Sequence, residues 1–139
     1  MKRALIVILI LFVTGTVFAE NWHKADSKQV GWDAPTILHD GTPLPAGIQG
    51  WIFTLYSKDV SGANVVVELQ TGAAPVTVTI IEGGKKYIGA SAAYVDVDGI
   101  TSDDSEIAWS DNPVDCENGV TFGIHNLKRP DKPQNMRLP

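Results

Sequence analysis

The chain has very little cysteine and histidine, which argues against folds held by disulfides or metal centres. Cys116 is the only cysteine, so an exported form of the chain has no internal disulfide. Its thiol is either free or bridged to another molecule. The histidines, His23, His39 and His125, do not have the spacing of metal ligands. We therefore expect packing alone to hold the fold.

Sequence motifs of catalysis are missing as well. The chain has no nucleophile elbow of the Gly-x-Ser-x-Gly type, no phosphate-binding loop and no dinucleotide fingerprint. Acidic residues are plentiful, but a glycosidase needs two carboxyl groups opposed across a cleft, which a single small sandwich seldom offers. We therefore predict no enzymatic activity and name no catalytic residue.

Basic residues are scarce too. Without Lys2 and Arg3, nine basic residues stand against 16 acidic ones, a net charge of −7. Nucleic acids and anionic lipid surfaces both require a basic footprint, so the charge argues against either as a partner. The charge is also uneven, because the chain between Lys86 and Lys128 has eight acids and no basic residue, whereas residues 128–139 have four basic residues and one acid.

The one long hydrophobic run lies at the N-terminus. A short positive region precedes an apolar segment at residues 4–13, and Val17 and Ala19 are the small residues that a signal peptidase accepts. The run of about ten residues is too short to cross a hydrocarbon core of ~30 Å. We predict that residues 1–19 are a cleaved signal peptide. The mature protein is then extracellular, at the cell surface or periplasmic, with no membrane insertion.

Beyond residue 19 the sequence has the pattern of short β-strands. Alternating and β-branched segments recur between clusters of Gly, Pro, Asn and Asp, which is typical of sandwiches and barrels. No stretch longer than about a dozen residues keeps the 3.6-residue period of a helix. The expected strands cover residues 29–32, 50–56, 64–69, 76–81, 86–97 and 105–109, with 120–124 as a further candidate. We predict one all-β domain over residues 20–127 and a basic, proline-containing tail over 128–139.

Residues 50–56 form the clearest of these strands. Successive side chains of a strand point to opposite faces, so one face of this strand carries Trp51, Phe53 and Leu55. The same alternation predicts three apolar side chains on one face of the following strand: Val65, Val67 and Leu69.

Several segments, taken in order, resemble fibronectin type III domains. Residues 30–35 (VGWDAP) are similar to the second strand of that family, in which a proline follows a core tryptophan. Residues 40–44 (DGTPL) and 50–53 (GWIF) resemble its next loop and third strand, with Trp51 in the place of a tyrosine. Residues 95–107 (VDVDGITSDDSEI) resemble the end of its sixth strand and the entry to its seventh.

This resemblance covers residues 27–110 and implies an immunoglobulin-like sandwich of two sheets with about seven strands. It implies that Trp32 and Trp51 are core residues. It also implies a buried tyrosine early in the sixth strand, for which Tyr87 is the candidate. The register of residues 86–97 stays open, because a shift of one residue brings a more apolar set to the core face, and a bulge in this strand is an alternative. That set is Ile88, Ala90, Ala92 and Tyr94.

The two ends of the chain depart from the family. Residues 20–26 are all that precede the second strand, and Asn21–Lys24 make a poor first strand. We therefore expect an unpaired sheet edge at that position. Residues 129–138 (RPDKPQNMRL) resemble the opening strand of a further domain of this type.

Two tryptophans outside the expected core are candidate binding residues. Trp22 lies near the mature N-terminus and Trp109 at the end of a strand. Tryptophan combines a large contact area with a polar N–H group, so an exposed patch of the two would suit a sugar or a protein.

The acidic segment 96–106 is a weak candidate for calcium, and we predict no cofactor. Asp96, Asp98 and Asp103 supply the carboxylate oxygens that Ca²⁺ prefers, but the segment does not have the ligand spacing of an EF-hand loop. A type I turn with solvated carboxylates is the simpler interpretation.

Two functional hypotheses follow. The leading one is an exported binding, adhesion or spacer module of fibronectin type III type, whose partner is an unidentified protein or carbohydrate. The alternative is a structural subunit in which the C-terminal tail, residues 128–139, adds a strand to an open sheet edge of the same subunit or of a neighbour. A homo-oligomer bridged through Cys116 is a variant of the second hypothesis.

Overall fold

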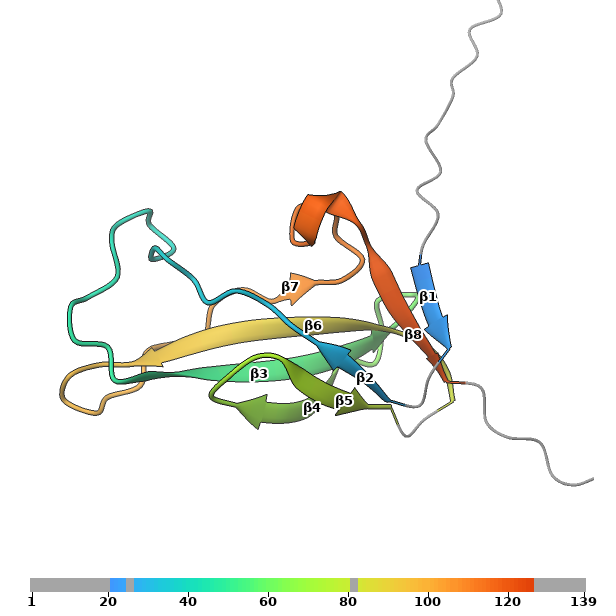
Figure 1. The fold of residues 1–139 in the computed structure, drawn as a ribbon, viewed down its shortest axis with the longest axis horizontal. Helices are drawn as coiled ribbons and strands as arrows, with labels where there is room; N and C mark the ends of the chain where they lie inside the picture. Colours follow the sequence, from blue (N-terminus) through green and yellow to red (C-terminus); the bar gives the residue numbers. More distant parts are fainter. Residues whose placement is uncertain (1–20, 25–26, 81–82, 127–139) are drawn as a thin grey trace, which may run out of the picture.

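The computed structural model describes residues 21–24, 27–80 and 83–126 (Figure 1). In chain order they form β1 (Asn21–Lys24), β2 (Ser27–Val30), β3 (Gly50–Asp59), β4 (Val66–Thr71), β5 (Val76–Thr79), β6 (Gly84–Val95), β7 (Ala108–Trp109), the 3₁₀ turn η1 (Glu117–Gly119) and β8 (Phe122–Asn126). These residues contain no α-helix, which confirms the predicted all-β fold. Within them, no helix has the length and hydrophobicity that a membrane span requires. The predicted signal peptide (1–19) and tail (128–139) lie outside the described residues.

Two sheets of unequal size make up the fold. The main sheet has six strands in the order β1-β8-β6-β3-β4, with β7 also paired to β6. The main sheet is mixed, because β1 runs parallel to β8, whereas all the other strand pairs of this sheet are antiparallel. β2 and β5 form a separate antiparallel pair (Figure 1). This division of six strands and two differs from the more even one that the resemblance implies.

Residues of both sheets meet in one hydrophobic core. Its buried members are Val30, Val78 and Ile80 from the β2–β5 side and Phe53, Leu55, Ile88 and Ile124 from the main sheet. Trp32 and Trp51, the expected core tryptophans, are half-buried and pack against this cluster. The Trp32 ring meets Phe53 edge-on at a centroid distance of 5.2 Å. Both tryptophans therefore border the core rather than fill it.

The register of β6 places Tyr87 on the face opposite to the core. Ala90 lies opposite Leu55 of β3, whose side chain is completely buried in the core, so Ile88 and the other even-numbered residues face inward. This is the more apolar of the two expected registers, and the β3–β6 pairing has no bulge. Tyr87 is nevertheless only 3% exposed. The Trp22 ring lies 5.2 Å from the Tyr87 ring and covers it on that second face.

A bulge between β3 and β4 reverses one expected face. Tyr56 of β3 pairs with Val67, and the register shifts between this pair and the previous one, so Glu68 is an extra residue of β4. Val67 therefore shares the face of Tyr56 and is 58% exposed. The prediction that Val65, Val67 and Leu69 lie on one face is wrong, because period-two alternation fails wherever two residues oppose one.

The N-terminal strands differ from the expected ones. Asn21–Lys24, a poor strand by its sequence, form β1 and pair in parallel with β8. β2 ends at Val30, two residues before the predicted end. Residues 31–49 then run outward as an irregular excursion, drawn in cyan to green, before the chain returns at β3 (Figure 1).

Candidate functional site

The two candidate tryptophans lie on the same face of the main sheet. Trp22 pairs in register with Gly123 of β8, and Trp109 pairs with Gly89 of β6. Both positions share the side of the sheet to which Tyr87 points, opposite to the core. The aromatic and cationic side chains gathered there form what we call the aromatic face: Trp22, Tyr56, Lys58, Lys85, Tyr87 and Trp109.

Glycine makes room for both indole rings. A Cβ atom at Gly89 would lie 2.6 Å from a ring atom of Trp109 and 2.7 Å from the Ile107 side chain. A Cβ atom at Gly123 would overlap the ring of Trp22. Each indole therefore lies directly on the backbone of the neighbouring strand, which is a role that glycine within a strand commonly has.

Lysine ammonium groups accompany both rings. Lys58 Nζ is 4.3 Å from the centroid of the Trp109 ring and 2.9 Å from Asp111 Oδ2. Lys85 Nζ is 4.7 Å from the centroid of the Trp22 ring. Such cation–π contacts contribute about 0.5–1 kcal/mol each at exposed sites. The aromatic face is thus an apolar surface that carries the positive charge of Lys85, while the charge of Lys58 is paired with Asp111.

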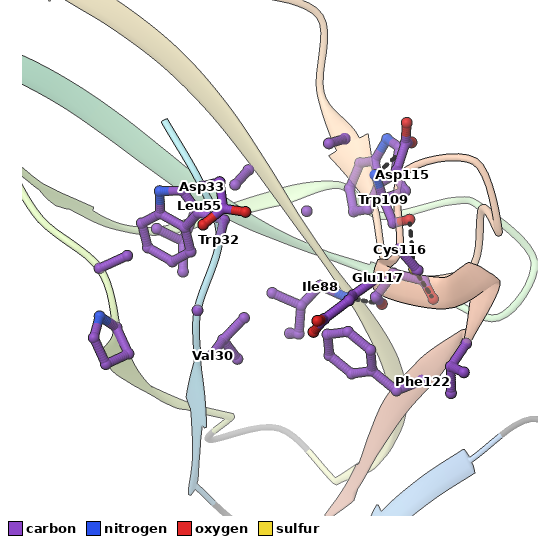
Figure 2. A pocket seen from close by; sticks show the side chains of 18 residues that line it. Val30, Trp32, Asp33, Leu55, Ile88, Trp109, Asp115, Cys116, Glu117 and Phe122 are labelled. Carbon is purple, nitrogen blue, oxygen red and sulfur yellow. Dashed lines mark hydrogen bonds between the residues drawn. The ribbon is translucent and has the colours of Figure 1, made fainter. Parts of the chain in front are cut away.

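A cavity of about 1040 Å³ opens on the opposite, core-facing side of the main sheet. Figure 2 shows Val30 and Trp32 on one side of it, Cys116 and Phe122 on the other, and Ile88 between the two walls. The cavity is open to solvent because the β2–β5 pair covers only part of the core face. The apolar side chains that remain partly accessible in its lining include Trp32, Val120 and Phe122.

One wall of this cavity is a strand edge. β2 pairs with β5 along one side. On its other side, within the described residues, neither Val30 nor residues 31–33 have a backbone hydrogen-bond partner. An unpaired edge of this kind is a template for a further strand. Residues 30–33 therefore offer such an edge beside the cavity, while the open edge expected from a poor first strand stays a prediction.

The rim of the cavity is acidic. Asp33 lines it on the β2 side, and Asp115 and Glu117 line it on the η1 side, whereas the lining includes no Lys or Arg. The Asp115 carboxylate also accepts hydrogen bonds from the Trp109 backbone N–H at 3.0 Å and from Asn112 Nδ2 at 2.9 Å, which fixes this part of the wall.

Cys116 lies in the same wall and is half-buried. Its thiol donates to the Ser110 carbonyl oxygen, with Sγ 3.4 Å from that oxygen. Burial, and then the charges of Asp115 and Asp111, raise the pKa of the Cys116 thiol. Because the thiolate is the reactive form, these features slow disulfide formation at neutral pH. The disulfide-bridged dimer stays a prediction.

The acidic segment uses its first carboxylate to hold a turn. Asp96 Oδ1 accepts hydrogen bonds from the backbone N–H groups of Asp98 at 2.9 Å and Ile100 at 2.8 Å, around Gly99 with a φ of 79°. Among residues 21–24, 27–80 and 83–126, no group of three or more His, Cys, Asp or Glu side chains is arranged to hold a metal ion. The structure thus gives Asp96 a role within the turn.

Sequence reasoning named Trp22, Trp109 and Cys116 but not the features that position them. Gly89 and Gly123 carried the available signal, since an isolated glycine in a strand indicates close approach of another group. The cavity had no signal of its own, because it depends on how little of the core face the second sheet covers.

No protein-family model, no curated protein and no solved structure matches this chain.

Proposed function

We propose that this protein is an exported, non-catalytic binding, adhesion or spacer module with a fibronectin type III-like sandwich fold. The identity of the paired strands supports this fold, although the two sheets are less even than in that family. If β2 and β5 are the B and E strands, and β3, β6 and β8 are C, F and G, the partition agrees with that of immunoglobulin-like domains. The shared core of the two sheets supports the same interpretation.

The observation that supports binding is the gathering of Trp22 and Trp109 on one face. These residues are far apart in the sequence, yet both stand beside tyrosines and lysines on the aromatic face. Aromatic side chains with neighbouring cations are the usual anchors of interfaces, and indole rings also stack on sugars. The partner class is accordingly a protein or a carbohydrate.

Binding of the mature chain to a glycan array and to candidate surface proteins tests this function. The variants Trp22→Ala and Trp109→Ala should weaken any specific binding at least tenfold, because truncated aromatic anchors cost most at an interface. Val114→Ala is the matched control, since Val114 is 87% exposed and lies outside both the aromatic face and the cavity. Equal binding by all three folded variants would remove the aromatic face from the proposal.

A second candidate function is self-assembly of a structural subunit. The specific observation in its favour is that, among the described residues, the backbone of residues 31–33 has no hydrogen-bond partner beside the cavity. Addition of an extended segment, here the C-terminal tail (128–139), would pair that edge and cover the apolar side chains that remain partly accessible in the cavity. Sedimentation of the mature chain, with and without residues 129–139, tests it. Unchanged mass and unchanged melting temperature after the deletion would contradict self-assembly.

A further inference from the structure

We infer that the cavity beside β2 is the acceptor site for the C-terminal segment of a second copy of this chain, with residues 134–138 as the inserted strand. This inference rests on the second proposed function, self-assembly. It specifies which edge accepts the tail, which residues enter, and which copy supplies them.

The apolar pattern of the segment fits the cavity. In an extended segment over residues 134–138, Met136 and Leu138 fall on one side and Asn135 and Arg137 on the other. The accessible apolar side chains of the cavity lining include those of Trp32, Val120 and Phe122. Two apolar side chains spaced by one residue would therefore point into it, while the backbone of the segment pairs with the chain edge at residues 30–33.

Charge complementarity points to the same segment. The lining contains carboxylates from Asp33, Asp115 and Glu117 and no basic residue. Residues 128–139 contain four basic residues and one acid. A basic strand on an acidic rim is attracted at long range, and the outward side chain of Arg137 would lie at that rim.

Strand direction favours a second copy as the source. β8 ends at Asn126, and β2 and β8 run in opposite directions (Figure 1). A tail that turned back along β8 into its own cavity would run parallel to β2, which is the less stable type of pairing. A tail from another copy is free to enter antiparallel to β2.

The length of the tail allows this exchange. Residues 127–139 span at most about 43 Å when extended, and the five inserted residues need about 17 Å of that. The remainder is a linker between copies. Pro130 and Pro133 lie in the linker, where the missing backbone N–H does not interrupt the new pairing.

The natural Cys116 makes a direct test possible, because it lines the acceptor cavity. Donor chains carry Cys116→Ser and one new cysteine, Met136→Cys or Leu138→Cys. They are mixed with tagged wild-type chains and oxidised with diamide at pH 8.5. A donor–acceptor disulfide to Cys116 should form at least tenfold faster from one of these positions than from the matched controls Asn135→Cys and Arg137→Cys.

Several outcomes would overturn the inference. Equal rates from all four positions would mean that no strand with the expected alternation is inserted. In chains that carry both Cys116 and the new cysteine, an intramolecular disulfide would assign the segment to its own cavity. Absence of any disulfide to Cys116 would exclude the cavity.

A second measurement separates this inference from the function on which it rests. Val120 is 53% exposed and lines the cavity, so Val120→Asp should weaken assembly at least tenfold in sedimentation. Val114→Asp, away from the cavity, should leave it unchanged. If the wild type assembles through its tail but Val120→Asp assembles equally well, self-assembly stands and the acceptor site is wrong. If the wild type does not assemble at any concentration, both fail.

Discussion

The central β3–β6 pair is buried on both of its faces, but by different means. On the core face, Leu55 and Ile88 are aliphatic and pack against the second sheet. On the aromatic face, Tyr87 and Ser91 are just as inaccessible, at 3% and 2% exposed, although the described part of the chain places no second sheet there. Aromatic side chains take the place of a second layer: the Trp22 ring packs against Tyr87, and the Tyr56 hydroxyl lies 3.3 Å from Ser91 Oγ. Low exposure alone therefore does not identify the core of this protein.

The two kinds of burial should respond to opposite changes. Aliphatic contacts are non-directional, so the core face should be sensitive mainly to the removal of atoms. The aromatic face depends on rings lying directly on glycine, so it should be sensitive mainly to the addition of atoms. Substitutions that delete atoms on the core face and add atoms on the aromatic face therefore test whether the two faces differ in this way.

The largest effect is expected from Leu55→Ala. Leu55 is 0% exposed and lies at the centre of the core cluster, so truncation leaves a cavity. We expect the free energy of unfolding to fall by about 2–5 kcal/mol, measured by urea denaturation. A loss below about 1 kcal/mol would mean that the core relaxes freely around this position, and would contradict the expected sensitivity of the core face to the removal of atoms.

The next effect is expected from adding a single methyl group at Gly89. The new Cβ would meet the rings and side chains of Trp109 and Ile107, so Gly89→Ala should lower the free energy of unfolding by about 1–3 kcal/mol. Gly50→Ala is the matched control, because Gly50 is in β3 and a Cβ there has no neighbour within 4 Å. Equal denaturation midpoints for the two variants would show that Trp109 does not lie on Gly89.

A smaller effect is expected from the lysines of the aromatic face. Lys58 lies between Trp109 and Asp111, so Lys58→Met should cost about 0.5–1 kcal/mol. High salt should narrow the difference from wild type, because the ion pair is screened. Lys85→Met is the comparison variant, and its smaller effect follows from its exposed position. If the loss of unfolding free energy in Lys58→Met does not depend on salt, Lys58 stabilises the fold through packing of its aliphatic stem.

Local patterns predicted the strands of this fold better than their faces. Alternation over residues 50–56 correctly placed Trp51, Phe53 and Leu55 on one face, because β3 pairs with β6 without interruption, and the structure shows that this face meets the core. The same rule failed at Val67, since the extra residue Glu68 is a property of the β3–β4 pairing and leaves no mark in either strand alone. The parallel pairing of β1 was also hidden, because Asn21–Lys24 lack strand propensity and depend on β8.

The candidate site was predictable only in part for a related reason. Trp22 and Trp109 could be named from their residue type. That they share a face depends on the registers of three strand pairs, β1–β8, β6–β8 and β6–β7. The cavity depends on coverage, which is a tertiary property. A period-two pattern predicts which side chains share a face of a strand, but it does not predict which part of the protein packs on that face.

The smallest expected effect concerns the edge of the core face, where Lys86 pairs with Asp59. Hydrogen bonds from Lys86 and then Asn64 hold the pKa of the Asp59 carboxyl below its ordinary value of 3.8. A carboxyl whose pKa is lower in the folded state stabilises the fold above the unfolded pKa, and this contribution is lost as the pH falls through the folded pKa. The melting temperature of Asp59→Asn should therefore lie below that of wild type above pH 5, and the two should converge below pH 4. Asp40 is a second carboxyl whose pKa is lowered, by hydrogen bonds from Thr42. Its contribution to the pH dependence is measured separately with Asp40→Asn. If the difference in melting temperature between wild type and Asp59→Asn stays constant down to pH 2, the Lys86–Asp59 pair stabilises the sheet edge by packing and not by charge. The two faces of the β3–β6 pair would then both depend mainly on packing.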